Sequence, residues 1–238
     1  MLNNAHPRPG AESEKTREPQ YQECIDAVAA RGFERLGLRS SQSWHDDPKH
    51  LLFRLSRYKF VAKMLSGSEH VLEIGCGDAF GTRLVQQEVK ALSATDFDEV
   101  FIKDVKARMV ERWNFPVFTH DLLDGPISGD YDGIFALDVL EHISPSDEHT
   151  FLKNAFAPLT QYGVAIIGMP SLESQVHASP TSRAGHVNCK SMPELKKTMQ
   201  EYFHNVFMFS MNDEVVHTGY YPMAHYLFAV ATNKKSDK

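Results

Sequence analysis

The sequence has few cysteines and no long apolar run. Cys24, Cys76 and Cys189 lie far apart among the 238 residues and include no CxxC pair. An odd number of scattered cysteines excludes a disulfide framework and a zinc knuckle, and it is typical of a reducing cytoplasm. The longest apolar runs, such as 164–169, are too short to cross a bilayer, and the polar N-terminus lacks the apolar segment of a signal peptide. We therefore expect a cytoplasmic protein that does not enter a membrane.

Positive charge is also scarce. Lys and Arg total 25 against 31 Asp and Glu, which gives a formal net charge of −6. A mildly acidic chain lacks the basic surface of a duplex nucleic-acid binder. Hydrophobic residues make up 42% of the chain, which is ordinary for a globular protein with a real core. We expect a small-molecule substrate, no nucleic acid and no membrane. A homodimer stays open, because helices expected at 21–65 could either cap a ligand site or pair two subunits.

Composition divides the chain into four segments. Residues 1–20 are polar and contain several prolines, which predicts a disordered tail. Residues 21–66 form a predicted N-terminal helical extension, in which Asp47 followed by Pro48 is the pattern of a helix start. Apolar residues then recur at helical spacing to about Leu65. Residues 67–233 are expected to form the main domain, and 234–238 a polar C-terminal tail.

The main domain alternates short apolar runs with helical stretches. The expected helices are 81–88, 98–112, 146–157 and 191–202, and the expected strands are 70–75, 91–96, 116–121, 131–138, 163–169, 205–211 and 224–231. The connection between the last two strands is too short for a crossover, so they are expected to be antiparallel. This order predicts an α/β fold: a Rossmann-like, seven-stranded, mostly parallel sheet with a terminal antiparallel hairpin and helices on both faces.

The first expected strand runs into a glycine turn, Gly75-Cys76-Gly77. Glycine lets the backbone turn sharply and lets a ligand approach where a β-carbon would block it. Asp96 ends the second expected strand about 20 residues later, a spacing at which an acid can bind the ribose hydroxyls of a nucleoside cofactor. A nicotinamide dehydrogenase would have Gly-x-Gly-x-x-Gly, whereas here the third glycine, Gly81, comes one residue too late.

Four motifs follow consecutive strands of the predicted sheet. They are VLEIGCG (71–77), TDFD (95–98), HDLL (120–123) and DVLEHI (138–143). With these motifs, residues 50–231 resemble the class I S-adenosylmethionine-dependent methyltransferases, and DVLEHI is typical of their small-molecule branches. The resemblance implies S-adenosylmethionine as cofactor and a terminal antiparallel hairpin. One departure is Ala79, where the family usually has a third glycine; alanine is small enough that we expect cofactor binding to survive.

The resemblance also assigns cofactor contacts position by position. Asp96 would bind the ribose hydroxyls, Asp121 would accept a hydrogen bond from the adenine amino group, and Asp138 would lie beside the sulfonium. Arg57 either reaches the methionine carboxylate or is a solvated arginine on its helix face. The residues that the resemblance places at the cofactor are Arg57, Glu73, Gly75, Cys76, Gly77, Asp96, Phe97, Asp121, Leu122 and Asp138.

Methyl transfer to a hydroxyl benefits from a general base, most often histidine, worth about 10²–10⁴-fold. The candidate catalytic side chains are His142, His186 and Asp138, of which the carboxylate would steady the sulfonium charge. His142 could instead support its own loop, and His186 could belong to the start of the following helix. His177 and His217 lie on loops at the same expected edge, but a surface position is more typical of histidines with no motif around them.

The sequence contains no compact metal-ligand motif, so we expect no metal. The set that could still hold a divalent ion, as in some O-methyltransferases, is Asp138, Glu141, His142 and His177.

These observations predict an S-adenosylmethionine-dependent methyltransferase that acts on a small polar acceptor. A hydroxyl is the first choice, on a sugar or sugar nucleotide, because polar, histidine-bearing loops surround the expected site. The stretch 138–141 lacks the Pro-Pro-aromatic motif of enzymes that methylate amino groups of bases. An N- or S-methyltransferase of a small metabolite, an enzyme acting on protein or RNA, and a non-catalytic interaction subunit stay open as alternatives.

Overall fold

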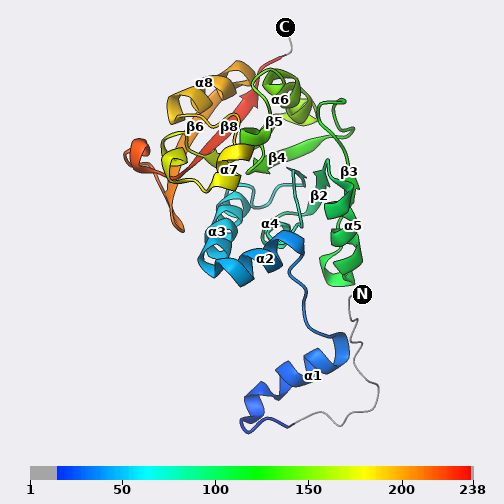
Figure 1. The fold of residues 1–238 in the computed structure, drawn as a ribbon. Helices are drawn as coiled ribbons and strands as arrows, with labels where there is room; N and C mark the ends of the chain where they lie inside the picture. Colours follow the sequence, from blue (N-terminus) through cyan, green and yellow to red (C-terminus); the bar gives the residue numbers. More distant parts are fainter. Residues whose placement is uncertain (1–14, 237–238) are drawn as a thin grey trace. The chain divides into compact units, whose positions relative to one another are not determined.

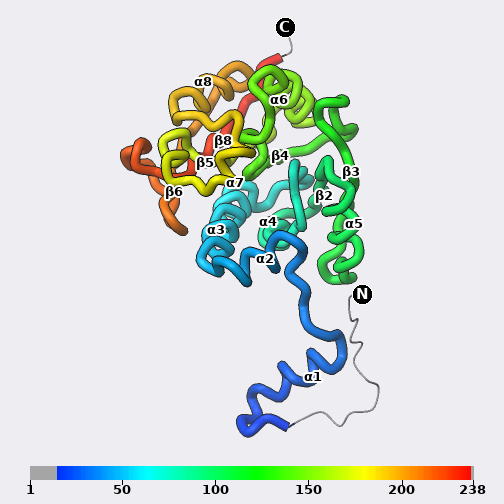
Figure 2. Tube along the Cα trace, in the orientation of Figure 1, coloured from blue at the N-terminus to red at the C-terminus, as the bar shows by residue number. Residues whose placement is uncertain are grey.

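Eight strands form one sheet within residues 15–236, the part of the chain that the computed structural model describes (Figure 1). They are β1 (His70–Ile74), β2 (Ala91–Asp96), β3 (Val117–Thr119), β4 (Tyr131–Leu137), β5 (Leu159–Pro170), β6 (Phe203–Asn212), β7 (Val215–His217) and β8 (Tyr226–Lys234). Their order across the sheet is β3-β2-β1-β4-β5-β8-β6-β7, and β1 to β5 are parallel. The last strand, β8, which leads to the red C-terminal end of the trace in Figure 2, lies between β5 and β6 and is antiparallel to both.

The predicted Rossmann-like architecture is confirmed, with one extra strand. The predicted terminal hairpin corresponds to β6 and β8, and the additional β7 is a three-residue edge strand in the connection between them. Because β8 is antiparallel to both of its neighbours, β6 runs in the same direction as the parallel strands. The segment from β6 to β8 therefore starts at the carboxyl edge of the sheet, the edge at which ligands bind in open α/β sheets.

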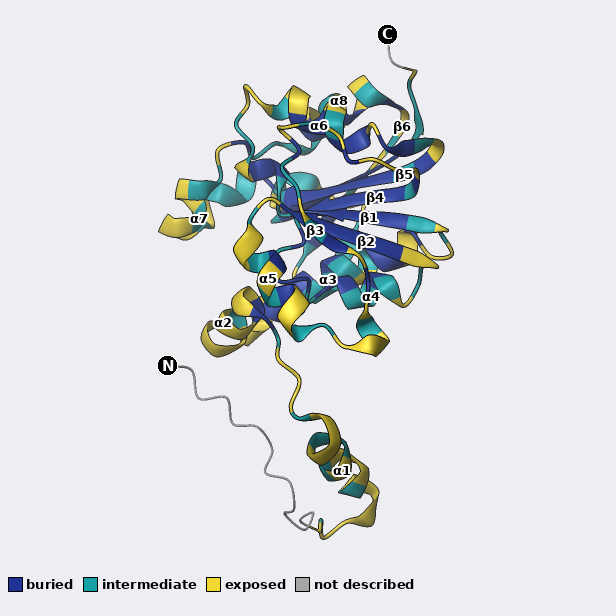
Figure 3. Ribbon diagram, turned by 90° about the vertical axis from the view of Figure 1, so that its right-hand side faces the viewer, coloured by how far each residue is buried: buried dark blue, intermediate teal, exposed yellow. Residues whose placement is uncertain are grey.

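Helices cover both faces of the sheet (Figure 3). The helices of this unit are α2 (Leu38–Asp46), α3 (Pro48–Met64), α4 (Thr82–Gln86), α5 (Glu99–Arg108), α6 (Glu148–Phe156), α7 (Pro180–Gly185) and α8 (Met192–Tyr202). Alternate residues of β4 face opposite layers: Phe135 packs with α3, α4 and α5, whereas Ile134 packs with α6 and α8. A sheet buried on both faces explains why its parallel strands read as continuous apolar runs. None of the described helices has both the length and the apolar character needed to span a membrane.

Helix α3 starts as predicted. The carboxylate of Asp47 accepts a hydrogen bond from the backbone N–H of His50 (3.4 Å), and Pro48 is the first helical residue. The buried face of this helix contains not only apolar residues but also Arg54 and Arg57. Two buried arginines on one helix face require partners inside the protein. Arg54 donates to Ser40 and Ser43 of α2, and Arg57 donates to Asp138 at the end of β4.

The chain separates into two compact units at Leu36 and Gly37. The described part of the first unit contains a 3-10 turn (Pro19–Tyr21) and α1 (Gln22–Arg31), which buries no residue. The second unit contains α2 and α3 together with the sheet, so it begins inside the stretch predicted as a helical extension. Most of the predicted disordered tail, residues 1–14, lies outside the described residues.

The C-terminal boundary differs from the prediction. Lys234, expected to begin a polar tail, is the last residue of β8. Its ammonium group donates to the backbone carbonyls of Phe156, Ala157 and Leu159 at 2.8–3.1 Å. These carbonyls end α6 and begin β5, and a lysine satisfies such helix-end acceptors well. The sequence analysis missed this role because the three acceptors lie far from Lys234 along the chain.

Candidate active site

The glycine turn after β1 leaves space beside its backbone. Gly75 and Gly77 have φ angles of +74° and +54°, a region that favours glycine. A β-carbon at Gly75 would lie 2.3 Å from a methyl group of Val139, so this position is closed to larger residues. A β-carbon at Gly77 would have no neighbour within 4 Å. The turn is thus packed on one side and open on the other, where a ligand can approach the backbone.

Asp96 fastens this turn to the end of β2. Its carboxylate accepts hydrogen bonds from the backbone N–H groups of Gly77 (2.8 Å) and Asp98 (2.9 Å). The residue is only 7% exposed, whereas the adjacent Phe97 is 73% exposed. Each carboxylate oxygen accepts one of these bonds and keeps capacity for another donor. Asp96 can therefore hold the turn and bind ligand hydroxyls at the same time.

The end of β3 lies next to the end of β2. The carboxylate of Asp121 accepts a hydrogen bond from the backbone N–H of Leu123 (2.9 Å), which fixes its direction. Leu122 is buried in the core, and its carbonyl accepts a hydrogen bond from the side chain of Asn154 (2.6 Å). The predicted adenosine contacts thus meet at one sheet edge, and their roles stay predictions.

Helix α2 holds the far side of the glycine turn. The carboxylate of Asp78 accepts hydrogen bonds from the backbone N–H (2.6 Å) and the hydroxyl (3.1 Å) of Ser40. Arg54 of α3 also donates to the Ser40 hydroxyl (2.7 Å). Ala79, the departure from the family pattern, has a φ of +50°. An alanine adopts this left-handed conformation at some cost, and the contacts of Asp78 help to hold it there.

Glu73 is buried beneath the turn. Its two carboxylate oxygens accept hydrogen bonds from the hydroxyls of Tyr58 (2.7 Å) and Thr82 (2.5 Å), and the residue is 1% exposed. The pKa of Glu73 is raised to about 7. Burial is the main cause, the charges of Asp96 and Asp78 add to it, and the two hydrogen bonds act in the opposite direction. Glu73 thereby ties α3 and α4 to β1.

Glu73→Gln is expected to change how stability depends on pH. The pKa of Glu73 is higher in the folded chain than in the unfolded chain, so folding takes up a proton between pH 4.5 and about 7. The contribution of Glu73 to the free energy of unfolding, about 3 kcal/mol in total, is fully present below pH 4.5 and is lost as the pH rises through about 7. The free energy of unfolding of the wild type, relative to the glutamine variant, should therefore fall over this range. Urea denaturation at pH 4.5, 6 and 7.5 without ligand measures it, and a constant difference would contradict the burial effect.

Arg57 and Asp138 form a buried ion pair. Nη1 of Arg57 donates to both carboxylate oxygens of Asp138 (2.7 and 2.8 Å), and the two side chains are 8% and 13% exposed. The guanidinium also lies over the ring of Tyr226, 3.9 Å from its centre. Burial is the largest single effect and would raise the pKa of Asp138, but the charges of Arg57 and Arg39 and the hydrogen bonds to the carboxylate together outweigh it, so the pKa is lowered. Arg57 is therefore not a solvated arginine, and Asp138 is a carboxylate at the end of β4, with a φ of +56°.

His142 and His186 lie together at the same edge, with ring centres 5.2 Å apart. Nδ1 of His142 is 2.8 Å from the carbonyl oxygen of Gly185, and Nδ1 of His186 is 2.8 Å from the side-chain oxygen of Gln175. Because both partners are acceptors, each Nδ1 carries the hydrogen and each Nε2 is left with a lone pair when the ring is neutral. Burial lowers the pKa of His186, so neutrality is favoured there.

Glu141 lies between these histidines and Asp138 in sequence. Its residue is 1% exposed, and neither carboxylate oxygen has a hydrogen-bond partner among the described residues. Burial, and then the charge of Asp138, raise the pKa of Glu141. The backbone carbonyl of Glu141 accepts hydrogen bonds from the N–H groups of Val187 and Asn188 (2.8 and 3.0 Å), which brings the segment after α7 to this turn.

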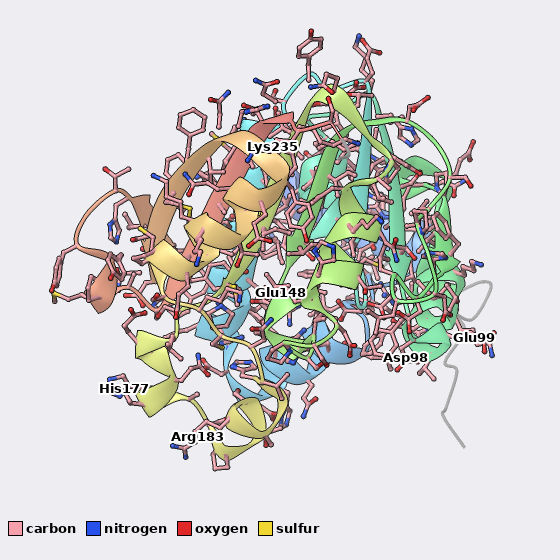
Figure 4. All side chains as sticks on the ribbon, turned by 90° about the horizontal axis from the view of Figure 1, so that it is seen from above. Asp98, Glu99, Glu148, His177, Arg183 and Lys235 are labelled. Atoms are coloured by element: carbon pink, nitrogen blue, oxygen red, sulfur yellow. The ribbon has the colours of Figure 1, made fainter. Side chains whose placement is uncertain are left out.

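The other two histidines considered from the sequence lie elsewhere. His177 is exposed, and its side chain points outward at the surface (Figure 4). Both ring nitrogens of His217 are used within the hairpin loop: Nε2 bonds to Asn212 (2.8 Å) and Nδ1 accepts from the N–H of Gly219 (3.0 Å). Neither histidine joins the pair formed by His142 and His186.

A family model for a methyltransferase domain matches residues 71–163, from β1 into β5. The chain contains a methyltransferase domain with the class I fold. The matched residues include the glycine turn, the ends of β2 and β3, and the turn with Asp138 and His142. None of the curated protein sequences compared with this methyltransferase matches it.

Solved structures share the fold of this methyltransferase at low sequence identity. The methyltransferase domain of bacterial CtHen1-C is 18% identical (TM-score 0.63; 76% of this chain and 98% of that chain covered). A complex of the Trm112 methyltransferase activator with a methyltransferase from Haloferax volcanii matches with 14% identity (0.66; 88% and 97%). The N-methyltransferase NodS from Bradyrhizobium japonicum WM9, solved with S-adenosyl-L-homocysteine, is 19% identical (0.60; 79% and 89%). The fold also occurs in a carbon methyltransferase, so it does not specify the acceptor.

The cofactor of this methyltransferase is S-adenosylmethionine, and the edge residues fit it. Gly77 leaves open space beside the backbone, and Asp96 keeps acceptor capacity for hydroxyl groups. Phe97 presents an exposed ring next to Asp96, and Asp138, largely but not fully buried, supplies a carboxylate for a sulfonium. Which atom of the cofactor each residue contacts stays a prediction.

Three residues that shape the site were not predicted from the sequence. Tyr58 holds Glu73, Asp78 holds Ser40, and Gln175 orients His186. For Tyr58 a signal was available: Arg54, Arg57 and Tyr58 continue the buried face of α3 at spacings of three and four residues, so their side chains point inward. Asp78 and Gln175 have no comparable local signal, because their partners come from distant segments.

Proposed function

We propose that this methyltransferase transfers the methyl group to a hydroxyl of a small polar acceptor, such as a sugar or a sugar nucleotide. The pair of His142 and His186 carries this proposal. An amine or thiolate acceptor needs little more than alignment, whereas a hydroxyl is a poor nucleophile that needs activation. Two imidazoles whose Nε2 atoms have no hydrogen-bond partner among residues 15–236, at the carboxyl edge with Asp138, favour an acceptor that must lose a proton.

Some residues of the site act on S-adenosylmethionine and others act on the acceptor. When bound, S-adenosylmethionine supplies a methyl group on a positively charged sulfur. Asp138 presents its carboxylate at this position, and Arg57 keeps that carboxylate ionised and in place. Nε2 of His142 or His186 accepts the proton of the acceptor hydroxyl while the oxygen forms its bond to the methyl carbon. The open side of Gly77 and the carboxylate of Asp96 hold the adenosyl part.

The proposal extends to the partners, the compartment and the oligomeric state of the protein. The formal net charge of −6 supports a small-molecule acceptor rather than nucleic acid, and we propose no membrane partner. Three cysteines without a disulfide within residues 15–236 support action in the cytoplasm. Exposed apolar side chains on α2, Leu38 and Trp44, support a homodimer in which two subunits pair through this helix.

Methyl transfer to a panel of sugars and sugar nucleotides, with amine and thiol metabolites as controls, tests the function. We expect turnover with a hydroxyl acceptor only, and an acidic limb of the pH–rate profile below pH 6.5, because burial lowers the pKa of His186. Transfer to amines alone, independent of pH in this range, would contradict the proposal and favour N-methylation. A folded chain that binds no S-adenosylmethionine would favour a non-catalytic interaction subunit.

A further inference from the structure

Glu141, His142 and His186 bring three metal-binding side chains together at the carboxyl edge. One ligand atom from each lies within 4.8 Å of the other two. Nε2 of His142 is 3.9 Å from the carboxylate of Glu141, too far for a hydrogen bond. An ion at about 2.0–2.2 Å from each ligand holds the ligand atoms roughly 3–3.5 Å apart. The three side chains therefore need only small rotations to close on one ion.

The carboxylate of Glu141 gives an independent reason to expect a ligand here. It is 1% exposed, and within residues 15–236 neither of its oxygens has a hydrogen-bond partner. A buried carboxylate without partners is costly, and buried polar groups almost always have one. Arg57, whose charge also acts on Glu141, is already engaged by Asp138. A cation between Glu141 and the two histidines would supply the missing partner.

Both imidazoles are oriented as metal ligands are. A metal-binding histidine typically donates its other ring N–H to a carbonyl or carboxylate, which fixes the tautomer and the ring direction. His142 has this arrangement with Gly185, and His186 has it with Gln175. The amide of Gln175 is itself fixed, because its nitrogen donates to the carbonyl of Ser171 (3.0 Å). Each Nε2 is thus left free to bind an ion.

The donor set selects the class of metal. Two imidazoles and one carboxylate suit divalent first-row transition metals such as Zn²⁺, Mn²⁺ or Co²⁺, whereas Mg²⁺ and Ca²⁺ prefer sites made of oxygen ligands. Three protein ligands also leave positions open for a substrate atom, as in catalytic rather than structural sites. His177, which the sequence placed in the possible ligand set, is exposed and outside the cluster.

We propose that Glu141, His142 and His186 bind one divalent first-row transition-metal ion, and that this ion holds and acidifies the acceptor hydroxyl. The second half rests on the proposed function. With both Nε2 atoms on the ion, the ion replaces the histidines as the group that activates the hydroxyl. The hydroxyl proton passes to solvent water, the oxygen forms a bond to the methyl carbon, and the carbon–sulfur bond breaks with its electron pair remaining on sulfur.

Metal binding is measured on the full chain after treatment with EDTA, with Co²⁺ as a spectroscopic probe and Zn²⁺ as a competitor. We expect one equivalent of Co²⁺ with visible absorption bands that Zn²⁺ removes. Glu141→Gln, His142→Ala and His186→Ala should each weaken Co²⁺ binding by about 100-fold or more, because changes outside the ligand shell alone cost about 10–100-fold. Gln175→Ala, which removes only the hydrogen bond that orients His186, should weaken Co²⁺ binding by about 10–100-fold.

His177→Ala is the matched control, since it removes an exposed histidine and should bind Co²⁺ like the wild type. The chain has 12 histidines, so weak surface binding must be separated from the site. Co²⁺ should also raise the Tm of the wild type but not that of Glu141→Gln, whose uncharged amide keeps the fold testable without metal. A wild type without stoichiometric Co²⁺, or cluster variants that bind as tightly as His177→Ala, would overturn the site.

An activity measurement separates this proposal from the proposed function. Methyl transfer to a hydroxyl acceptor that is lost with EDTA and restored with Zn²⁺ or Mn²⁺ supports both. Transfer that continues unchanged in EDTA overturns the role of the ion and leaves the histidines as general bases. If the chain binds one equivalent of Co²⁺ but methylates no hydroxyl acceptor, the metal site is supported and the proposed acceptor is overturned.

Discussion

Arg57→Met is expected to lower the free energy of unfolding by about 3–5 kcal/mol, because it leaves a buried carboxylate without its cation. Asp138 is 13% exposed and receives both of its charged hydrogen bonds from Arg57. Methionine keeps much of the volume of the arginine stem, so the loss reports the charge rather than a cavity. Urea denaturation at pH 7 measures the change from the shift of the transition midpoint.

Two controls make this prediction specific. The double variant Arg57→Met/Asp138→Asn should recover most of the stability, since neither charge is then left alone, and asparagine tolerates the positive φ of this position. Lys63→Met on the same helix removes an exposed pair with Glu88 and should cost about 1 kcal/mol or less. Equal effects of Arg57→Met and Lys63→Met would contradict a buried ion pair at the site.

Asp96→Ala is expected to weaken S-adenosylmethionine binding by about 10²–10⁴-fold. Two hydrogen bonds to a charged group contribute about 1.5–3 kcal/mol each, and each 1.4 kcal/mol corresponds to a factor of ten. The alanine also releases the N–H of Gly77, so the glycine turn loses the contact that fixes it to β2. Calorimetric titration with S-adenosylmethionine and S-adenosylhomocysteine measures the change.

The matched control for Asp96→Ala is Asp98→Ala, two residues along the same segment. Asp98 caps α5, where its carboxylate accepts a hydrogen bond from the N–H of Val100 (2.9 Å). Its loss should cost about 1 kcal/mol of stability and leave cofactor affinity unchanged. If the two variants lose affinity equally, Asp96 has no specific role in binding the cofactor.

The elements that could be predicted from the sequence depend on neighbouring residues. Asp47 caps α3 because a side-chain acceptor and a following proline act within one helical turn. Gly75 could be identified because its strand and its turn are adjacent in the chain. The strand–helix alternation follows from apolar periodicity within short windows. The edge strand β7 was missed because three residues carry too little periodicity to be distinguished from a loop.

The site itself depends on contacts between distant residues. Arg57 and Asp138 are 81 residues apart, and His142 and Gly185 are 43 apart. Ser40 and Asp78, which hold the outer side of the glycine turn, are 38 apart. The periodicity of a single sequence does not encode which distant segments meet. Arg57 could therefore be placed near the cofactor by resemblance, but its partner could not be named.

The sequence by itself determined the fold class, because apolar runs are local patterns. One glycine turn, acids at strand ends and the family resemblance that they carry predicted the cofactor and the edge of the sheet that would bind it. Only the tertiary structure decided that Arg57 pairs with Asp138, that His142 meets His186, and that Glu141 is buried beside them with no hydrogen-bond partner among residues 15–236. The reason is that β4, α3 and the segment after α7 meet in the fold and bring these charged groups into one place of low dielectric constant. There the partners of each group, and not its residue type, determine what it can do.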